Sequence, residues 1–388
     1  MTGAFSASDR HARHRMIDWF DQDRLAAMRV AVIGAGAIGN EVCKNLALLG
    51  VGHLSVWDRD RVEPHNLTRS VLFRDEDIGR DKAEVVARRA AALDPSVRVE
   101  GIVADVVDTL RPSRLAGFDL VLGCLDNFEA RLRLNELCLI AGVDLVDGAI
   151  DARHASVELL PFSAGRRLGC YECGLPPSAY GRIAQRYSCG GLRRAGLAER
   201  RVPTTIVTSS MAGAMMVSWG LRMGRPAPRG PGAAPADGPR RLHIDAVDGR
   251  TRVSAIVRGD ACPCCGPLTG DALALLHWRA GEPLAPGPAG GALRLRLPEP
   301  VVFGARCAAC GEDARAALPA GSRVRRHTTD ATRCARCGED AVGVDARDTA
   351  TLSDLLEATG GRPPELPFLW VDDPRTPLCV EIDACPTT

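Results

Sequence analysis

The chain has 388 residues, enough to bury a large core and to form two domains. Its formal net charge is +1, with 49 Lys and Arg scattered among 48 Asp and Glu, which argues against tight binding along nucleic acid. No stretch approaches the ~18 consecutive apolar residues of a membrane span, and the polar N-terminus lacks an apolar signal core, so we expect a cytoplasmic protein.

The segment from Arg29 to Asp58 has the pattern of a strand, a helix and a second strand. Its first apolar run, RVAVI, leads into three glycines, Gly34, Gly36 and Gly39, the fingerprint of a nucleotide-binding turn. Gly34 permits the tight turn, Gly36 lets the backbone approach a phosphate, and Gly39 lets the helix pack close to the strand. Asp58 ends the second strand about 20 residues later, where a carboxylate can accept hydrogen bonds from ribose hydroxyls.

The segment after Asp58 carries polar and charged side chains, namely Asp60, Asn66, Arg69 and Lys82. A nicotinamide-dependent enzyme has no evident need for an Arg and a Lys here. An enzyme that attacks a phosphate does, because fixed cations stabilise the negative charge that accumulates on the phosphate oxygens in the transition state.

Strand-like and helix-like segments continue to alternate along the chain. We expect helices over 79–93 and 128–142 and strands over 97–103, 118–124, 143–150 and 155–160. This alternation predicts an α/β fold with a doubly wound, mostly parallel sheet, whose ligands lie at the carboxyl ends of the strands. Asp126 and Asn127 follow the strand at 118–124, and so fall at that edge.

Two stretches rich in Pro and Gly, 224–240 and 281–291, are predicted linkers. Between them, RLHIDAVDGRTRVSAIVRG alternates like a strand pair joined by a DG turn. We therefore expect a helical arm over 1–28, a main domain over 29–267 that contains the first linker, and a cysteine-rich C-terminal domain over 292–388.

The 15 cysteines include four C-x-x-C pairs, which indicate metal binding in a reducing compartment. Two such pairs that converge suit a tetrahedral Zn²⁺ held by four thiolates. The predicted ligands are Cys170, Cys173, Cys262 and Cys265 in a first site and Cys307, Cys310, Cys334 and Cys337 in a second, ribbon-like site. Cys264 lies between two ligands of the first site and is an alternative for one of them.

Taken together, these motifs resemble the adenylation domain of the ThiF/MoeB/HesA and ubiquitin-activating-enzyme superfamily. The matching pieces are the GAGAIG turn, the aspartates of WDRD, the segments HNLTR and IGRDK, and CLDN at 124–127. The resemblance covers about residues 10–267 and implies a Rossmann-like fold that binds ATP.

The resemblance also implies roles for single residues. Asp58 would hold the ribose, Arg69 and Lys82 the phosphates, and Asp126 a Mg²⁺ ion, while Asp60, Asn66 and Asn127 would support that site. The family's leading arm carries an Arg that reaches the nucleotide of the partner subunit, which implies a homodimer. Arg13 fits the family's motif best and Arg10 fits its spacing best, so both remain candidates.

Cys189 stands apart from the paired cysteines, in the polar segment QRYSCGG. Related activating enzymes carry a cysteine at this point that forms a thioester with the activated C-terminus. Nearby arginines would lower the pKa of the thiol and favour the thiolate: Arg182, Arg186, Arg193 and Arg194. The alternative is an incidental loop cysteine, because some members of the superfamily adenylate without a thiol.

The leading hypothesis is ATP-dependent adenylation of the C-terminal glycine of a small ubiquitin-like or sulfur-carrier protein, followed by transfer to Cys189. A downstream conjugating protein would then be a further partner. The nearest alternative is adenylation of a short peptide in natural-product biosynthesis. An NAD-dependent oxidoreductase and a non-enzymatic zinc-ribbon adaptor are the alternatives from other classes.

Overall fold

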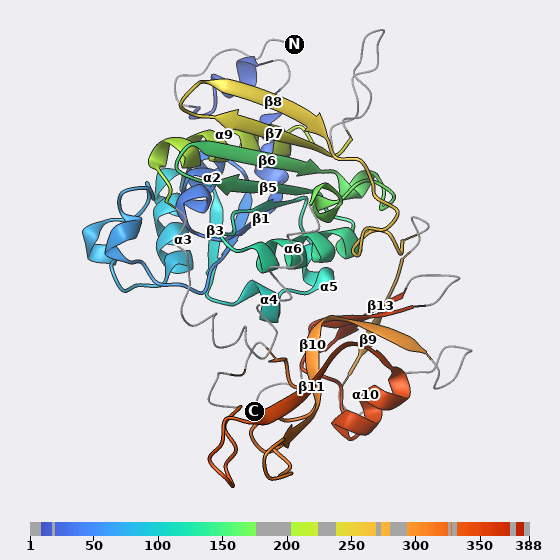
Figure 1. The fold of residues 1–388 in the computed structure, drawn as a ribbon. Coiled ribbons are helices and arrows are strands. Elements are labelled where there is room, and N and C mark those ends of the chain that lie inside the picture. The colour runs from blue at the N-terminus through green and yellow to red at the C-terminus, as the bar shows by residue number, and fades with distance from the viewer. Residues whose placement is uncertain are drawn as a thin grey trace. The chain divides into compact units, whose positions relative to one another are not determined.

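The computed structural model describes residues 9–17, 20–175, 203–223, 238–268, 273–279, 293–324, 327, 332–372 and 378–383. The described residues divide into two compact units, the first within 1–174 and 202–266 and the second within 267–388 (Figure 1). Most of the two predicted linkers lies outside the described residues.

The first unit is built on an eight-stranded sheet with the strand order β3-β2-β1-β4-β5-β6-β7-β8 (Figure 1). Five strands are mutually parallel: β1 Arg29–Ile33, β2 His53–Trp57, β3 Arg98–Ile102, β4 Leu120–Gly123 and β5 Leu145–Ile150. Three antiparallel strands extend the sheet beyond β5: β6 His154–Leu160, β7 Arg240–Asp245 and β8 Arg250–Ala255. The predicted doubly wound, mostly parallel sheet is confirmed.

Helices cover both faces of this sheet (Figure 1). One group consists of α2 Ala37–Leu48, α3 Lys82–Leu93 and α9 Ile206–Gly220, with α1 Gln22–Ala27 before β1. The other group consists of α4 Val106–Thr109, α5 Pro112–Leu115 and α6 Phe128–Ala141. The central strands are buried on both faces, which is why β1 and β4 are near-continuous apolar runs. The predicted end of α6 is confirmed, because Gly142 caps it in the left-handed region with φ +67°.

Short 3₁₀ segments connect these elements. They are η1 His14–Met16, η2 Pro64–Asn66, η3 Asp75–Asp77, η4 Phe162–Ala164 and η5 Tyr171–Gly174. The segment that holds η2 and η3 leads from β2 to α3, so the residues predicted to bind phosphate lie between two elements of the first unit.

The second unit contains a five-stranded sheet with the order β11-β10-β12-β13-β9. Its elements are β9 Ala274–Trp278, β10 Arg294–Cys307, β11 Val342–Thr351, α10 Leu352–Thr359, β12 Phe368–Val371 and β13 Leu378–Ile382. The sequence did not predict this sheet. β9 precedes the predicted linker at 281–291, yet it pairs in parallel with β13, about a hundred residues later in the chain.

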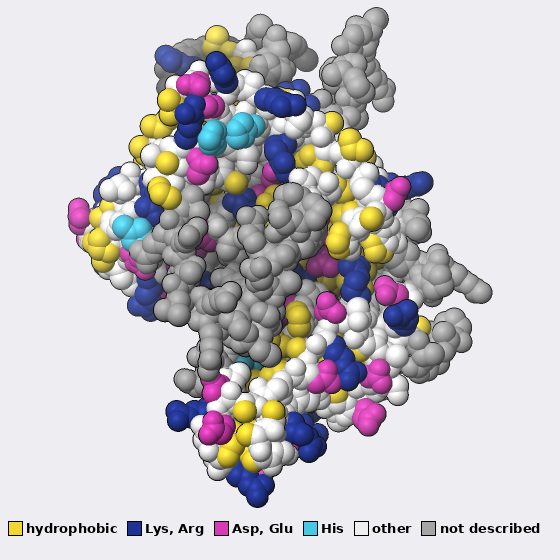
Figure 2. Space-filling model, in the orientation of Figure 1, with side chains coloured by type: hydrophobic (Ala, Val, Ile, Leu, Met, Phe, Trp, Pro, Cys, Tyr) yellow, Lys and Arg dark blue, Asp and Glu magenta, His cyan; other side chains and the backbone are white. Residues whose placement is uncertain are grey.

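Two surface features bear on the expected surroundings of the protein. Lys and Arg side chains are interspersed with Asp and Glu side chains on the face drawn in Figure 2, as the near-zero net charge suggests. Within the part of the chain that the structure describes, every helix is too short or too polar to cross a membrane.

Candidate nucleotide-binding and zinc sites

The parallel strands β1, β2, β4 and β5 all end at one edge of the first sheet. Their ends are tied together, because Gly34 N–H donates to the carbonyl of Trp57 at 2.8 Å and Cys124 N–H donates to the carbonyl of Ile33 at 2.7 Å. The predicted carboxyl edge is therefore formed, and the glycine turn lies at its centre (Figure 1).

The glycine turn leaves no room for larger residues at two positions. Gly34 has φ +101°, and a Cβ there would lie 2.5 Å from the carbonyl oxygen of Cys124. A Cβ on Gly39 would lie 2.0 Å from the carbonyl oxygen of Gly34. Gly36 caps α2, and apart from its two chain neighbours no described residue has an atom within 4 Å of where its Cβ would be. The N-terminus of α2 is thus bare backbone that can face an anion.

Asp58 is joined to this turn by its carboxylate. Asp58 Oδ2 accepts the N–H of Ala35 at 2.7 Å, and Asp58 Oδ1 accepts the N–H of Asp60 at 2.8 Å. Burial raises the pKa of Asp58, and the nearby charge of Lys82 opposes that shift. Asp58 therefore lies where a ribose bound beside the turn would meet it.

Lys82 begins α3 and points back to the same place. Its backbone N–H donates to the carbonyl of Asp60 at 2.9 Å, and its Nζ donates to Asp60 Oδ2 at 3.0 Å. The Lys82 side chain is only 13% exposed, so the cation is held in a fixed direction. The charge of Lys82 acts on both Asp58 and Asp60.

Asn66 and Arg69 lie on the segment between β2 and α3. Asn66 is buried, and its Oδ1 accepts the N–H of Glu63 at 2.9 Å. Its amide nitrogen has no hydrogen bond within the described part of the chain, so it can donate to a ligand. Arg69 donates to the carbonyl of His65 on its own segment. The structure thus places Arg69 on the expected segment, and its contact there is local.

Asn40 fastens this segment to the glycine turn, a role that the sequence analysis missed. Its Nδ2 donates to the carbonyls of Ala35 and Gly36 at 2.8 and 2.9 Å, and its Oδ1 accepts the N–H of Leu72 at 2.9 Å. The signal was an amide side chain directly after Gly39, in the first turn of a helix whose other face is apolar.

Asp126 and Asn127 lie between β4 and α6. Asn127 caps α6, because its Oδ1 accepts the N–H of Ala130 at 2.8 Å. Asp126 is exposed, and its carboxylate has no hydrogen bond or ion pair with the residues that the structure describes. An exposed carboxylate at this edge suits Mg²⁺, which binds through one or two carboxylates plus phosphate oxygens.

The two candidate arginines of the N-terminal arm differ in their surroundings. Arg10 Nη1 donates to the carbonyl of Leu93 at 2.7 Å and lies 3.1 Å from Asp94 Oδ1, both at the end of α3. Arg13 is exposed, and its side chain makes no polar contact with the described part of the chain. Among the residues that the structure describes, Arg10 is therefore the one of the two whose side chain has polar partners.

Cys189 lies outside the described residues, and so do the four arginines predicted to activate it. The helix that follows them, α9, is fixed at its start, because Thr208 Oγ1 donates to the carbonyl of Asp151 at 2.9 Å. Asp151 directly follows the carboxyl end of β5.

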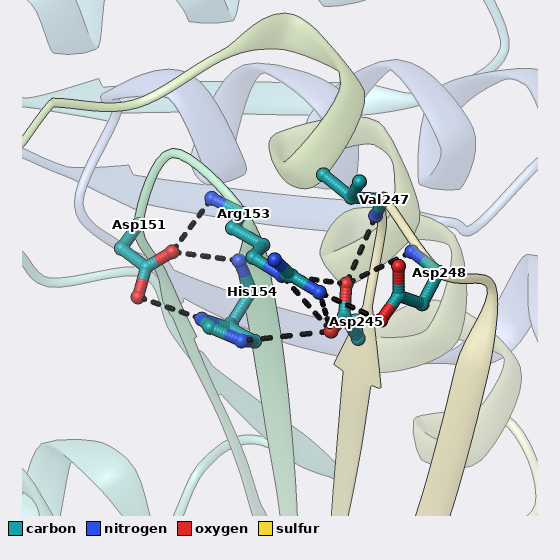
Figure 3. A network of polar contacts seen from close by, with 6 residues as sticks. All are labelled: Asp151, Arg153, His154, Asp245, Val247 and Asp248. Carbon is teal, nitrogen blue, oxygen red and sulfur yellow. Dashed lines mark hydrogen bonds and ion pairs between the residues drawn. The ribbon is translucent and has the colours of Figure 1, made fainter.

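Figure 3 shows how the turn after β5 is joined to the turn between β7 and β8. His154 lies between Asp151 and Asp245, and its Nδ1 is 3.2 Å from Asp151 Oδ2 (Figure 3). Arg153 Nη2 donates to Asp245 at 2.7 Å and to Asp248 at 2.8 Å. Hydrogen bonds from Arg153 hold the pKa of Asp245 well below its usual range. These charges are mutually satisfied, so the network stabilises this corner of the sheet.

The first four-cysteine group lies within the first unit. The ligand atoms of Cys170, Cys173, Cys262 and Cys265 all lie within 4.8 Å of one another. The separations of their sulfur atoms suit one tetrahedral Zn²⁺, for example 3.6 Å between Cys170 and Cys262 and 3.3 Å between Cys173 and Cys265. Cys264 lies outside this group, and its Sγ instead accepts a hydrogen bond from Asn135 Nδ2 at 3.3 Å.

The second four-cysteine group lies within the second unit. The ligand atoms of Cys307, Cys310, Cys334 and Cys337 also lie within 4.8 Å of one another. Both pairs form the same tight turn, because Gly311 N–H donates to the carbonyl of Cys307 and Gly338 N–H donates to that of Cys334, each at 2.9 Å. This donor set also fits Zn²⁺.

The sequence profile of the ThiF family matches residues 8–264, more than half of the chain. The chain belongs to the ThiF family. The predicted resemblance is therefore confirmed, and the matched residues include three cysteines of the first four-cysteine group and end one residue before the fourth, Cys265.

Two relatives illustrate this similarity. The chain is 39% identical over 172 residues to the SAMP-activating enzyme E1 of Haloferax volcanii. The aligned region covers 43% of the chain and 62% of that enzyme. The chain is also 33% identical over 248 residues to the sulfur carrier protein adenylyltransferase of Thermus thermophilus. That aligned region covers 63% of the chain and 84% of that enzyme. The chain thus spans less than two thirds of the length of the Haloferax relative.

Among solved structures, Escherichia coli MccB with ATP matches 67% of the chain and 75% of its own chain, with a TM-score of 0.51 and 22% sequence identity. At this identity the likeness concerns the fold. It confirms the Rossmann-like architecture of the first unit.

Proposed function

We propose that this member of the ThiF family adenylates the C-terminal glycine carboxylate of a small ubiquitin-like or sulfur-carrier protein. The observation that carries the proposal is the joining of Asp58, Asp60 and Lys82 beside a bare helix N-terminus. In that arrangement, the Asp58 carboxylate can accept hydrogen bonds from a ribose and Lys82 provides a cation held in one direction. The Asp126 carboxylate follows β4 at the same edge of the sheet.

In the proposed reaction, an oxygen of the substrate carboxylate attacks the α-phosphorus of ATP. A new P–O bond forms, the bond to the β-phosphate oxygen breaks, and pyrophosphate leaves. No general base is needed, because a carboxylate is ionised at neutral pH. Lys82 and Arg69 stabilise the charge on the departing phosphates. Asp126, with Asn127 beside it, would hold Mg²⁺, which neutralises phosphate charge when bound.

A second step would transfer the acyl group to Cys189. The thiolate attacks the carbonyl of the acyl-adenylate, a thioester forms and AMP leaves. The arm's Arg13 would act on the nucleotide of the partner subunit in a homodimer. Two Zn²⁺ ions would be structural, and a reducing, cytoplasmic compartment would keep their eight thiolate ligands intact.

The test combines the purified protein with MgATP and a small carrier protein ending in glycine, and follows pyrophosphate release and the mass of the carrier. We expect a carrier–AMP adduct that does not form when the carrier ends in an amide. Adduct formation on a short peptide and not on any carrier would favour the alternative substrate class. A nicotinamide absorbance change in place of an AMP adduct would contradict the proposal.

A further inference from the structure

Four charged side chains form a row across α6, β5, β6 and β7, called the buried row here because the first three are buried and only the last is partly exposed. In order they are Arg131, Asp147, Glu158 and Arg241. Asp147 and Glu158 lie directly opposite each other in the antiparallel pairing of β5 with β6, and both are buried. Arg131 donates to Asp147 Oδ2, and Arg241 Nε donates to Glu158 Oε1 at 2.6 Å. Each carboxylate therefore has one oxygen bound to an arginine.

The remaining oxygens of the two carboxyl groups lack a donor. Asp147 Oδ1 and Glu158 Oε2 are both buried without a hydrogen-bond partner in the described structure. Two carboxyl groups this close are poorly tolerated when both are ionised, and buried polar atoms are rarely left unsatisfied. A single proton shared by the two carboxyl groups would leave one negative charge in place of two between these paired residues.

Other groups packed around Asp147 do not supply that proton at neutral pH. The titratable ones are Cys124 after β4, Cys138 of α6 and Tyr171 of η5, and burial raises the pKa of each. From β4, Gly123 makes the space, because a Cβ there would lie 2.3 Å from Asp147 Oδ1, while α9 contributes the uncharged Met216 beside Gly148. Burial raises the pKa of Asp147 itself to about 7, and the charge of Arg131 opposes this shift.

Arg131 connects this buried row to the candidate nucleotide site. Its Nη2 donates to the carbonyl of Gly148 at 2.7 Å and also to the carbonyl of Leu125. Leu125 immediately precedes Asp126. One guanidinium thus holds the end of β5 and the loop that carries Asp126.

We propose that Asp147 and Glu158 share one proton, and that this proton keeps Arg131 on the carbonyl of Leu125 and thereby positions Asp126. When the proton leaves to solvent, two adjacent carboxylates repel each other, and Arg131 moves with Asp147 away from Leu125. Arg131 is then a positioning residue. The inference rests on the proposed function in one respect, the role of Asp126 in holding Mg²⁺ with ATP.

The first measurement is ATP binding by calorimetry, with Mg²⁺ and with EDTA, from about pH 6 to about pH 8.5. In the wild type, we expect the gain in affinity from Mg²⁺ to fall by about threefold or more as pH rises through this range. Asp147→Asn should make the gain independent of pH, because its amide can donate to Glu158 and accept from Arg131 permanently. Glu158→Gln is the second variant, with the same expectation.

The matched control is Asp144→Asn. Asp144 is also a buried carboxyl group with a raised pKa on the segment entering β5, but it accepts the N–H of Ser163 at 2.8 Å and is not a member of the row. This variant should retain the pH dependence of the wild type. Two results would overturn the proposal. One is a gain in ATP affinity from Mg²⁺ that does not change with pH in the wild type, and the other is a gain that changes with pH in Asp147→Asn as it does in the wild type.

A second measurement needs no nucleotide. Because the pKa of Asp147 is raised on folding, the proton it binds stabilises the folded state fully below the unfolded pKa of 3.8, and this contribution is lost as pH rises to about 7. In Asp147→Asn, the free energy of unfolding should not show this decrease between about pH 4 and about pH 7. If the free energy of unfolding depended on pH equally in Asp147→Asn and in the wild type, the shared proton would be excluded. Failure to bind ATP at any pH would contradict the proposed function alone, and the unfolding slope would still decide the inference.

Discussion

Lys82 and Asp60 form an ion pair beside the glycine turn, with 3.0 Å between Lys82 Nζ and Asp60 Oδ2. The Lys82 side chain is mostly buried, so the cation is fixed, whereas the side chain of its partner Asp60 is half exposed to solvent. Transition-state stabilisation requires charges that are oriented before the substrate arrives. The ion pair with Asp60 supplies such an orientation for Lys82.

Lys82→Ala should slow carrier-dependent ATP–pyrophosphate exchange by at least about 100-fold, or about 2.7 kcal/mol, as loss of an oriented transition-state donor does in other enzymes. The chain's other lysine, Lys44, pairs with Glu41 within α2, so Lys44→Ala is the matched control and should retain the exchange rate. A near-normal rate in Lys82→Ala would remove this residue from the mechanism.

ATP binding should weaken on acidification through the protonation of Asp58. Burial raises the pKa of Asp58, so its carboxylate becomes protonated at a higher pH than that of an ordinary aspartate, and it then loses its capacity to accept from the ribose. Calorimetric titrations with ATP in EDTA should show this loss in the wild type as pH falls. Asp58→Asn should bind weakly at every pH, and an acid-induced loss of affinity that persists in this variant would assign it to another group.

Substitutions of the two arm arginines should have different effects, with Arg10→Ala lowering stability and Arg13→Ala lowering activity. Arg10 is bound to Leu93 and Asp94 of its own subunit, so Arg10→Ala should lower thermal stability slightly, by about 0–1 kcal/mol for an exposed ion pair. Arg13→Ala should retain stability and lose exchange activity. Mixing Arg13→Ala with Lys82→Ala subunits should restore part of the activity, because one mixed site then has both residues intact. Failure of the mixture to recover activity would contradict the arm's action on a partner subunit.

Local patterns predicted the nucleotide-binding half well. The three glycines, Asp58 and the end of α6 at Gly142 each depend on a few neighbouring residues, and the structure has them where the periodicity indicated. The two four-cysteine groups were predicted for the same reason, since each C-x-x-C pair is a local turn.

Features set by pairing between distant residues could not be predicted. The buried row depends on the register that places Asp147 opposite Glu158, and neither residue is unusual in its own segment. The second sheet depends on β9 pairing with β13, which no periodicity reports. The contact of Arg10 with Asp94 likewise joins residues far apart in the sequence, so the different surroundings of Arg10 and Arg13 could not be predicted.

The cysteine variants should distinguish Cys264 from the ligands around it. Cys262 belongs to the first four-cysteine group, whereas Cys264 accepts a hydrogen bond from Asn135, so Cys262→Ser should lose one zinc equivalent and Cys264→Ala should retain both. Four-thiolate zinc contributes an apparent ~10–16 kcal/mol to folding in zinc-finger peptides, so Cys262→Ser should also lower the thermal midpoint markedly. Elemental analysis together with thermal unfolding measures both effects. If Cys264→Ala also lost one zinc equivalent, Cys264 would have to be counted among the ligands, and the hydrogen bond from Asn135 would not describe the metal-loaded protein.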